Sequence, residues 1–117
     1  MRILLIPLLI AICSCAAVNP AEVAGVWRFD TEDGSWVRLS FNEDGLGEKT
    51  TWHAENECGL DNDFYWEVRG AKVLITEIMF LDGLETVEIR DEASLSTNPD
   101  GAVQLIVRNY ERPFVRE

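Results

Sequence analysis

Short segments with period-two hydrophobicity, separated by turns, run through most of the chain and decide what it can fold into. In SWVRLSF, residues 35–41, the side chains of Val37, Leu39 and Phe41 fall on one face, as a half-buried strand requires. Turn sequences such as NEDGLG at 42–47 recur between these segments, with Gly supplying positive φ and Asn or Asp bonding locally. No segment shows a helical period, so the pattern predicts an all-β domain.

Eight strands are predicted from this pattern. Two arrangements suit eight antiparallel strands with one buried face, a closed barrel and a two-sheet sandwich. Because closure removes exposed edge strands, we expect a single antiparallel eight-stranded up-and-down barrel, with the sandwich as the alternative. The longest connection, AENECGLDND at 54–63, is expected to be a loop at the rim. The strands are expected at 24–30, 35–41, 46–54, 63–69, 72–80, 85–90, 93–97 and 102–110.

The charge of the chain excludes one class of partner. Its 117 residues are enough for one domain with its own core. They carry 21 acidic and 10 basic side chains, a formal net charge of −11. The phosphates of nucleic acid would repel such a protein, so we expect no nucleic-acid binding. The charge suits solubility or a basic protein partner.

The N-terminal apolar run, Ile3 to Cys13, is too short to cross a bilayer. A spanning helix takes roughly 20 apolar residues, and Pro7 lies within this shorter run. Arg2 precedes the run and small residues follow it, which is the order of a secretory signal peptide. Cleavage of an ordinary signal near Ala16 or Ala17 is one outcome.

The sequence ICSC at 12–15 points to another outcome, because it resembles the bacterial lipobox, with an aliphatic residue and then a small one before the acceptor cysteine. The resemblance implies that residues 1–14 are a lipoprotein signal peptide, and that Cys15 carries acyl groups such as palmitate. Residues 15–23 then form a lipidated tether that attaches the protein to a membrane of the bacterial cell envelope. Since Ala16 is not the aspartate of inner-membrane lipoproteins, we expect the outer membrane, facing the periplasm.

Residues 24–112, the expected barrel domain, resemble small bacterial lipocalin-like lipoproteins. The similar stretches are Gly25-Val26-Trp27, which resembles the lipocalin G-x-W motif, the hairpin FNEDGLG at 41–47, and the strand pair FYWEVRGAKVLIT at 64–76. The resemblance implies that Trp27 closes one end of the barrel and that Arg108, or alternatively Arg112, packs over it. The T-D-Y motif and the helix after the barrel, both found in lipocalins, are missing, and this chain is shorter.

Large aromatic side chains are expected inside the barrel. An eight-stranded barrel is wide enough to be filled by side chains or to hold one small ligand. The inward candidates are Phe29, Phe41, Trp52, Phe64 and Trp66, and they favour a filled interior. For a ligand at the open end, beside the 54–63 loop, the expected binding residues are Trp52, His53 and Trp66.

Binding is expected without chemistry. His53 is the chain's one histidine, and no G-x-S-x-G elbow is present, so we expect no enzyme and no catalytic residue. His53, Glu55, Glu57 and Cys58 lack the spacing of a zinc site, and we expect no metal or other cofactor. The expected function is binding of a small apolar ligand at the open end of the barrel. The alternative is a protein-binding module, an inhibitor or envelope assembly factor, that uses the acidic surface.

Overall fold

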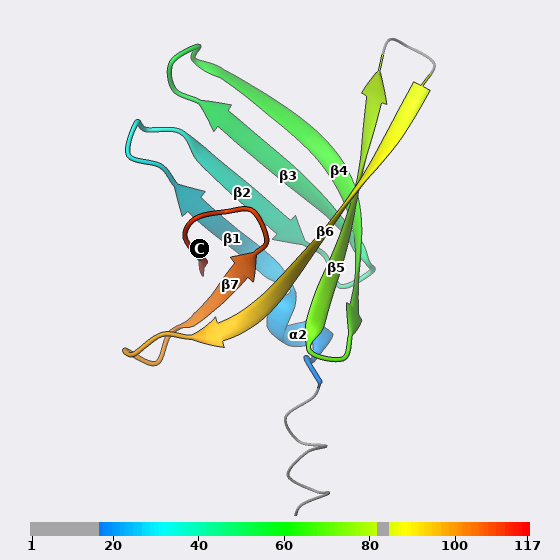
Figure 1. The fold of residues 1–117 in the computed structure, drawn as a ribbon, viewed down its shortest axis with the longest axis vertical. Helices are drawn as coiled ribbons and strands as arrows, with labels where there is room; N and C mark the ends of the chain where they lie inside the picture. Colours follow the sequence, from blue (N-terminus) through cyan, green and yellow to red (C-terminus); the bar gives the residue numbers. More distant parts are fainter. Residues whose placement is uncertain (1–16, 82–84) are drawn as a thin grey trace, which may run out of the picture.

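A computed structural model describes residues 17–81 and 85–117, which form one closed antiparallel barrel of eight strands in up-and-down order (Figure 1). Each strand pairs with the next, and the last pairs with the first, so the predicted barrel is confirmed and the sandwich is excluded. Residues 1–16, which include the expected signal peptide and Cys15, and residues 82–84, between two expected strands, lie outside the described residues. The strands are β1 (Gly25–Asp30), β2 (Trp36–Phe41), β3 (Leu46–His53), β4 (Cys58–Arg69), β5 (Lys72–Leu81), β6 (Glu85–Thr97), β7 (Val103–Val107) and β8 (Phe114–Arg116).

The alternation of β2 fixes which side chains of its neighbours enter the barrel. Val37, Leu39 and Phe41 are buried, as predicted. Directly opposite residues of an antiparallel pair share a face, and Leu39 lies opposite Lys49 of β3. Opposite Lys49, in turn, lies Asn62 of β4. Polar side chains of β3 and β4 therefore point into the barrel.

The rim loop predicted at 54–63 is wrong, because β4 begins at Cys58 and leaves only 54–57 as the connection. Residues 58–63 are mostly polar and have the composition of a loop. They nevertheless pair with residues 48–53 of β3. Gly59 lies opposite Trp52, and a Cβ at Gly59 would be in van der Waals contact with the Trp52 indole. Cross-strand pairing thus outweighs local composition in this segment.

The predicted break between the strands at 85–90 and 93–97 is also wrong, because both ranges belong to one continuous strand, β6. Asp91 lies opposite Ile75 in the ladder with β5. Its Oδ1 accepts hydrogen bonds from its neighbour's backbone N–H and from Nε of Arg108. The acidic residues of this segment are therefore paired within the sheet and form no turn.

The end of the barrel differs from the prediction in a related way. The strand expected at 102–110 is β7, which ends at Val107, and the chain then turns and adds β8. This strand lies beyond the expected domain end at 112, and it closes the barrel by pairing with both β7 and β1. A strand of three residues is too short to show periodicity in the sequence.

One end of the barrel is closed by α2 (Pro20–Val23), a single helical turn in the segment expected as a tether. Asn19 caps it, since its side chain accepts from Ala21 N and its own backbone N–H donates to Glu22. Val23 is completely buried, and its carbonyl accepts from Nε1 of Trp27 at 2.8 Å. No helix in residues 17–81 or 85–117 has the length and apolarity needed to cross a membrane.

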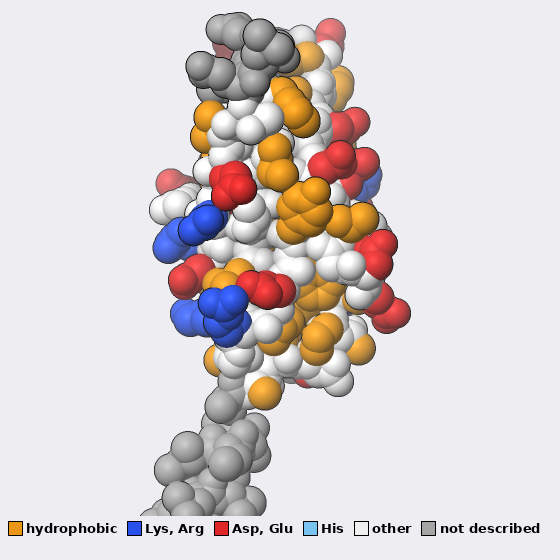
Figure 2. All heavy atoms as spheres, turned by 90° about the vertical axis from the view of Figure 1, so that its right-hand side faces the viewer, with side chains coloured by type: hydrophobic (Ala, Val, Ile, Leu, Met, Phe, Trp, Pro, Cys, Tyr) orange, Lys and Arg blue, Asp and Glu red, His pale blue; other side chains and the backbone are white. Residues whose placement is uncertain are grey.

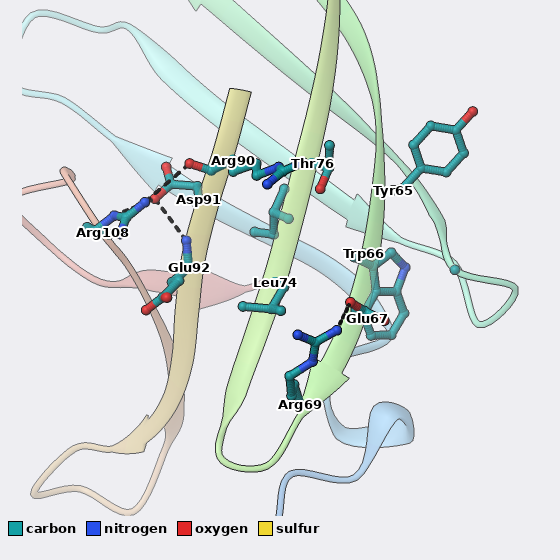
Figure 3. A pocket seen from close by; sticks show the side chains of 12 residues that line it. Tyr65, Trp66, Glu67, Arg69, Leu74, Thr76, Arg90, Asp91, Glu92 and Arg108 are labelled. Atoms are coloured by element: carbon teal, nitrogen blue, oxygen red, sulfur yellow. Dashed lines mark hydrogen bonds and ion pairs between the residues drawn. The ribbon is translucent and has the colours of Figure 1, made fainter. Parts of the chain in front are cut away.

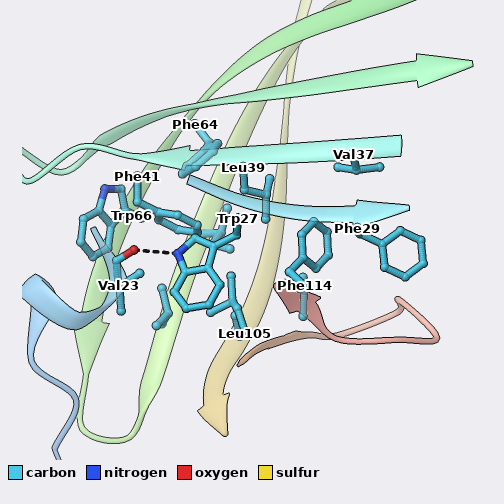
Figure 4. Close-up of a cluster of buried hydrophobic side chains, with 14 residues drawn as sticks. Val23, Trp27, Phe29, Val37, Leu39, Phe41, Phe64, Trp66, Leu105 and Phe114 are labelled. Atoms are coloured by element: carbon cyan, nitrogen blue, oxygen red, sulfur yellow. Dashed lines mark hydrogen bonds between the residues drawn. The ribbon is translucent and has the colours of Figure 1, made fainter. Parts of the chain in front are cut away.

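The core extends from Val23 of α2 along β1 and β2 as far as Phe29 and Val37 (Figure 4). Phe41 makes edge-to-face contacts with Phe64 and Trp66, at centroid distances of 5.1 and 5.3 Å. Phe29 and Phe114 pack together at 5.4 Å on the other side. Side chains fill this part of the barrel as expected, but the interior is not filled throughout, because a cavity lies between β3, β4, β5 and β6.

The opposite half of the barrel is more open. Pairing between β4 and β5 ends at Phe64 and Glu77, whereas β5 and β6 stay paired as far as Leu81 and Glu85. Beyond Glu77, β5 and β6 therefore form a two-stranded ribbon, which rises separately from the sheet of β1–β4 in Figure 1. We call this end of the barrel the open end.

Candidate functional site

A cavity of about 240 Å³ lies inside the open half, between β3, β4, β5 and β6. We call it the chamber. Inward side chains of β3 and β4 form one wall, and inward side chains of β5 and β6 form the other. The chamber is smaller than the roughly 300 Å³ at which sites for drug-sized ligands begin. It therefore fits a small molecule or the end of a longer one.

Three polar side chains form a connected group in the chamber. Nζ of Lys49 lies 3.2 Å from Oε1 of Glu77, and Nδ2 of Asn62 donates to Oε2 at 3.0 Å. Glu77 is 8% exposed, and among the described residues it is the one charged residue that is buried. Since both of its oxygens have partners, the desolvation cost of this carboxylate is offset.

The ammonium of Lys49 is held in its charged form. Burial acts to lower the pKa of Lys49, but the phenol of Tyr110 and the carboxylate of Glu77 outweigh it. The pKa of Lys49 therefore lies above its ordinary value. At neutral pH the chamber contains a neutralised ion pair, and the Asp91 carboxylate at its edge is paired with Arg108 at 3.2 Å.

Apolar side chains surround this polar group. Ile75 and Met79 of β5 line the chamber, together with Leu60 of β4 and Ile89 of β6. Leu60 and Ile89 are 52% and 42% exposed although both point to the inside of the barrel. Exposed large apolar groups at a cavity are typical of binding sites.

Of the three expected ligand-binding residues, His53 lines the chamber, at its rim. Trp52 is on the outside of the barrel, because it lies opposite Trp36 and points away from the buried face of β2. There the guanidiniums of Arg28 and Arg38 stack on Trp36 at 4.7 and 5.1 Å. The expectation that Trp52 points inward is therefore corrected by the register of β2 and β3.

Trp66 is buried in the core and lies away from the chamber. Its Nε1 donates to the carbonyl oxygens of Asn42 and Leu46 at 2.9 and 3.0 Å. These carbonyls belong to the turn between β2 and β3, at the closed end. Trp66 thus fixes a turn and does not line the chamber.

The expected arginine over Trp27 is present, but it is Arg116 and neither Arg108 nor Arg112. The Arg116 guanidinium lies 4.2 Å from the centroid of the Trp27 ring. The pairing of β8 with β1 places Arg116 directly opposite Trp27. Arg108 instead bonds Asp91, beyond the end of β7, and Arg112 lies 5.7 Å from the Phe29 ring.

Lys49, Asn62 and Glu77 were not expected from the sequence, although a signal for two of them is present in it. Glu77 interrupts the inward apolar series of β5, after Val73 and Ile75. Lys49 occupies an inward position opposite Leu39. Lys49 and Glu77 thus take inward positions on two strands that have one strand between them. Opposite charges placed in this way predict a buried ion pair.

A second cavity, of about 570 Å³, lies on the outer surface over β4, β5 and β6. The described residues contain no group of three or more His, Cys, Asp or Glu side chains placed to hold a metal ion.

Comparison with known proteins adds no relative, since no family model, no curated protein and no solved structure matches the chain. The chamber is therefore assessed from its own geometry.

Proposed function

We propose that this protein is a lipid-anchored protein of the bacterial cell envelope that binds a small, mostly apolar and uncharged ligand in the chamber. The observation that carries the proposal is the partly empty barrel interior, with Leu60, Met79 and Ile89 around the Lys49–Glu77 pair. Apolar walls with a few fixed polar groups are the usual make-up of a small-molecule site. The activity is binding, with no chemical step.

The charges of the chamber favour a ligand without a negative charge. Lys49 and Glu77 neutralise each other, and the Asp91 carboxylate at the edge is paired with Arg108. An anionic ligand would be partly desolvated beside two completed ion pairs, without a gain that offsets this cost. A hydroxyl or amide group can instead hydrogen-bond to the lysine or the carboxylate at lower cost.

A matched pair of ligands tests this proposal. Hexan-1-ol and hexanoate share a chain length and differ in charge at neutral pH. We expect hexan-1-ol to shift the amide resonances of the chamber strands β3–β6 in two-dimensional NMR titrations. Hexanoate should bind at least tenfold more weakly, a difference of about 1.4 kcal/mol. The absence of shifts with either ligand would contradict small-ligand binding.

A matched pair of variants tests the location. Thr51 lines the chamber, whereas Thr50 is the next residue along β3 and points outward. The variant Thr51→Trp places an indole in the cavity and should abolish hexan-1-ol binding. The variant Thr50→Trp makes the same substitution on the outer surface and should bind like the unmodified protein.

The lipocalin-like character of the barrel is part of the proposal. Its support is the contact of Arg116 with Trp27 at the closed end, which has the form that the resemblance implies even though the arginine is a different one. Location at the outer membrane, facing the periplasm, rests on the sequence around Cys15. The membrane anchor is tested separately, by the Cys15 variant described in the Discussion.

A further inference from the structure

β5 is apolar on both of its faces. Val73 and Ile75 point inward into the core, whereas Leu74, Ile78 and Phe80 point outward. We call these three outward side chains the apolar column. A strand with one face in water alternates apolar and polar residues, and a strand that is apolar on both faces is usually covered on both. Here Phe80 is 80% exposed.

The apolar column belongs to the outer face of β4–β6. Figure 2 shows a face of the molecule along which a band of hydrophobic side chains runs beside acidic ones. Tyr65 of β4, 53% exposed, lies opposite Thr76 and widens the apolar surface. The cavity of about 570 Å³ lies at the lower part of the column. Figure 3 shows Leu74 and Thr76 of β5 there, between side chains of β4 and β6.

Acidic side chains border the column on both sides. Glu67 of β4 and Glu92 of β6 both lie opposite Leu74, and Glu88 lies opposite Ile78. Three arginines line the cavity on this face, and all are paired: Arg69 with Glu67 at 3.0 Å, Arg90 with Glu88 at 3.3 Å and Arg108 with Asp91 at 3.2 Å. Asp61 and Asp63 lie on β4 beyond the last β4–β5 pair, where β4 has separated from β5, and Lys72 lies at the other end.

We propose that this face of β4–β6 docks an amphipathic helix of a partner protein, whose apolar stripe is bordered by lysine and arginine. Where the three strands are paired, β4 and β6 lie about 10 Å apart on either side of β5, since neighbouring strands are about 4.8 Å apart. A helix with its side chains is about 10–12 Å wide. Its apolar stripe would therefore meet the column, while its flanks meet Glu67 and Glu92 at the level of Leu74 and Glu88 on the β6 side farther along.

The length of the column sets the length of the helix. Leu74 and Phe80 are six residues apart, about 20 Å along a strand. A helix covers this distance with about 13 residues. The charge supports the same partner, because the whole chain carries −11 and attracts basic segments over long range.

A synthetic peptide tests the docking surface. The probe is an 18-residue peptide of leucine and lysine, in which the leucines follow the helical period and form one stripe. The control peptide has the same composition in strict alternation, the period of a strand. We expect the helical probe to bind in calorimetry, to shift amide resonances of β4–β6, and to bind more weakly as salt rises. The control peptide should bind at least tenfold more weakly.

Two double variants of the full chain locate the contact. In Ile78→Ser with Phe80→Ser, the upper part of the column is removed, and binding of the helical probe should weaken at least tenfold. In the control, Ile106→Ser with Val115→Ser, two apolar side chains with 38% and 49% exposure are removed from other strands. This control should bind within twofold of the unmodified protein, and both variants should show unchanged circular dichroism.

Three results would overturn the inference. One is equal binding by the column variant and the unmodified protein, and another is a set of shifts spread over acidic loops away from β4–β6. The third is self-association of the unmodified protein through the column in sedimentation experiments, which would make a second copy the occupant. Ile78 and Phe80 point away from the chamber, so hexan-1-ol binding should survive in the column variant. The two proposals therefore fail independently.

Discussion

The guanidinium of Arg116 lies over the indole of Trp27, 4.2 Å from the ring centroid, and joins the last strand of the barrel to the first. It also donates hydrogen bonds to the carbonyl oxygens of Glu22 and Ala24. One side chain thus holds α2, β1 and β8 together. The barrel is closed by a pairing of only a few residues between β1 and β8, and Arg116 reinforces that pairing.

Replacing Arg116 should destabilise the fold. In Arg116→Met the stacking and the two charged hydrogen bonds are lost, and we expect the free energy of unfolding in urea to fall by roughly 2 kcal/mol. Arg116→Lys should lose nearly as much, since an ammonium does not reproduce the planar fork. The control Arg69→Met removes an exposed ion pair and should cost less than about 1 kcal/mol. Equal effects of the two Met variants would count against this role.

The Lys49–Glu77 pair predicts a coupling that depends on pH. Because the pKa of Lys49 is raised in the folded state, its contribution to stability is fully present below its ordinary value and is lost as the pH rises through the folded value. A double-mutant cycle with Lys49→Met and Glu77→Gln should give a coupling of roughly 1–3 kcal/mol at pH 8. The coupling should shrink when unfolding is measured above about pH 11. A coupling that is independent of pH would contradict the assignment.

Gly47 should tolerate no side chain. A Cβ at this position would lie 2.3 Å from the Phe64 ring, its cross-strand partner, and 2.6 Å from the Ser40 carbonyl oxygen. Gly47→Ala should therefore lower the free energy of unfolding by about 1–3 kcal/mol through overpacking. Gly59→Ala is the matched control, because its Cβ would meet Trp52 at an ordinary 3.4 Å. Denaturation curves should show the control within about 0.5 kcal/mol of the unmodified protein.

The lipid anchor gives the fourth prediction. Expressed in a Gram-negative bacterium, the chain should fractionate with membranes, and its intact mass should match a chain that starts at Cys15 and carries acyl groups. Cys15→Ser should release the protein into the soluble fraction without acyl mass. Cys13→Ser should behave like the unmodified chain, because Cys13 leaves with the signal. A mature chain that starts after Cys15 would show an ordinary signal peptide instead.

The sequence was sufficient for the fold class because strand alternation is a local property. The inward series Val37, Leu39 and Phe41 could be read directly, and Trp27 was found at the closed end. The local sequence pattern was misleading where pairing with a neighbouring strand determines the backbone conformation. Residues 58–63 and 91–94 have the composition of turns, yet ladders with neighbouring strands hold them extended.

The site was harder to predict than the fold because register decides which side chains share a space. Trp52 and His53 are adjacent in sequence, and the ladder with β2 places Trp52 outside and leaves His53 at the chamber. Lys49 and Glu77 are 28 residues apart, and their contact depends on β4 lying between their strands. The helical turn α2 had a readable signal in Asn19-Pro20, a cap followed by proline at the first helical position.

The way the chain enters the barrel has a consequence for its orientation. The backbone N–H of Val18 bonds to the carbonyl of Gly70, in the turn between β4 and β5 at the closed end. Val18 is the third residue after Cys15, so the two lie at most about 11 Å apart along the chain. A lipid on Cys15 would therefore keep the closed end of the barrel close to the bilayer. The chamber would then face away from the membrane surface and would collect its ligand from the aqueous compartment above.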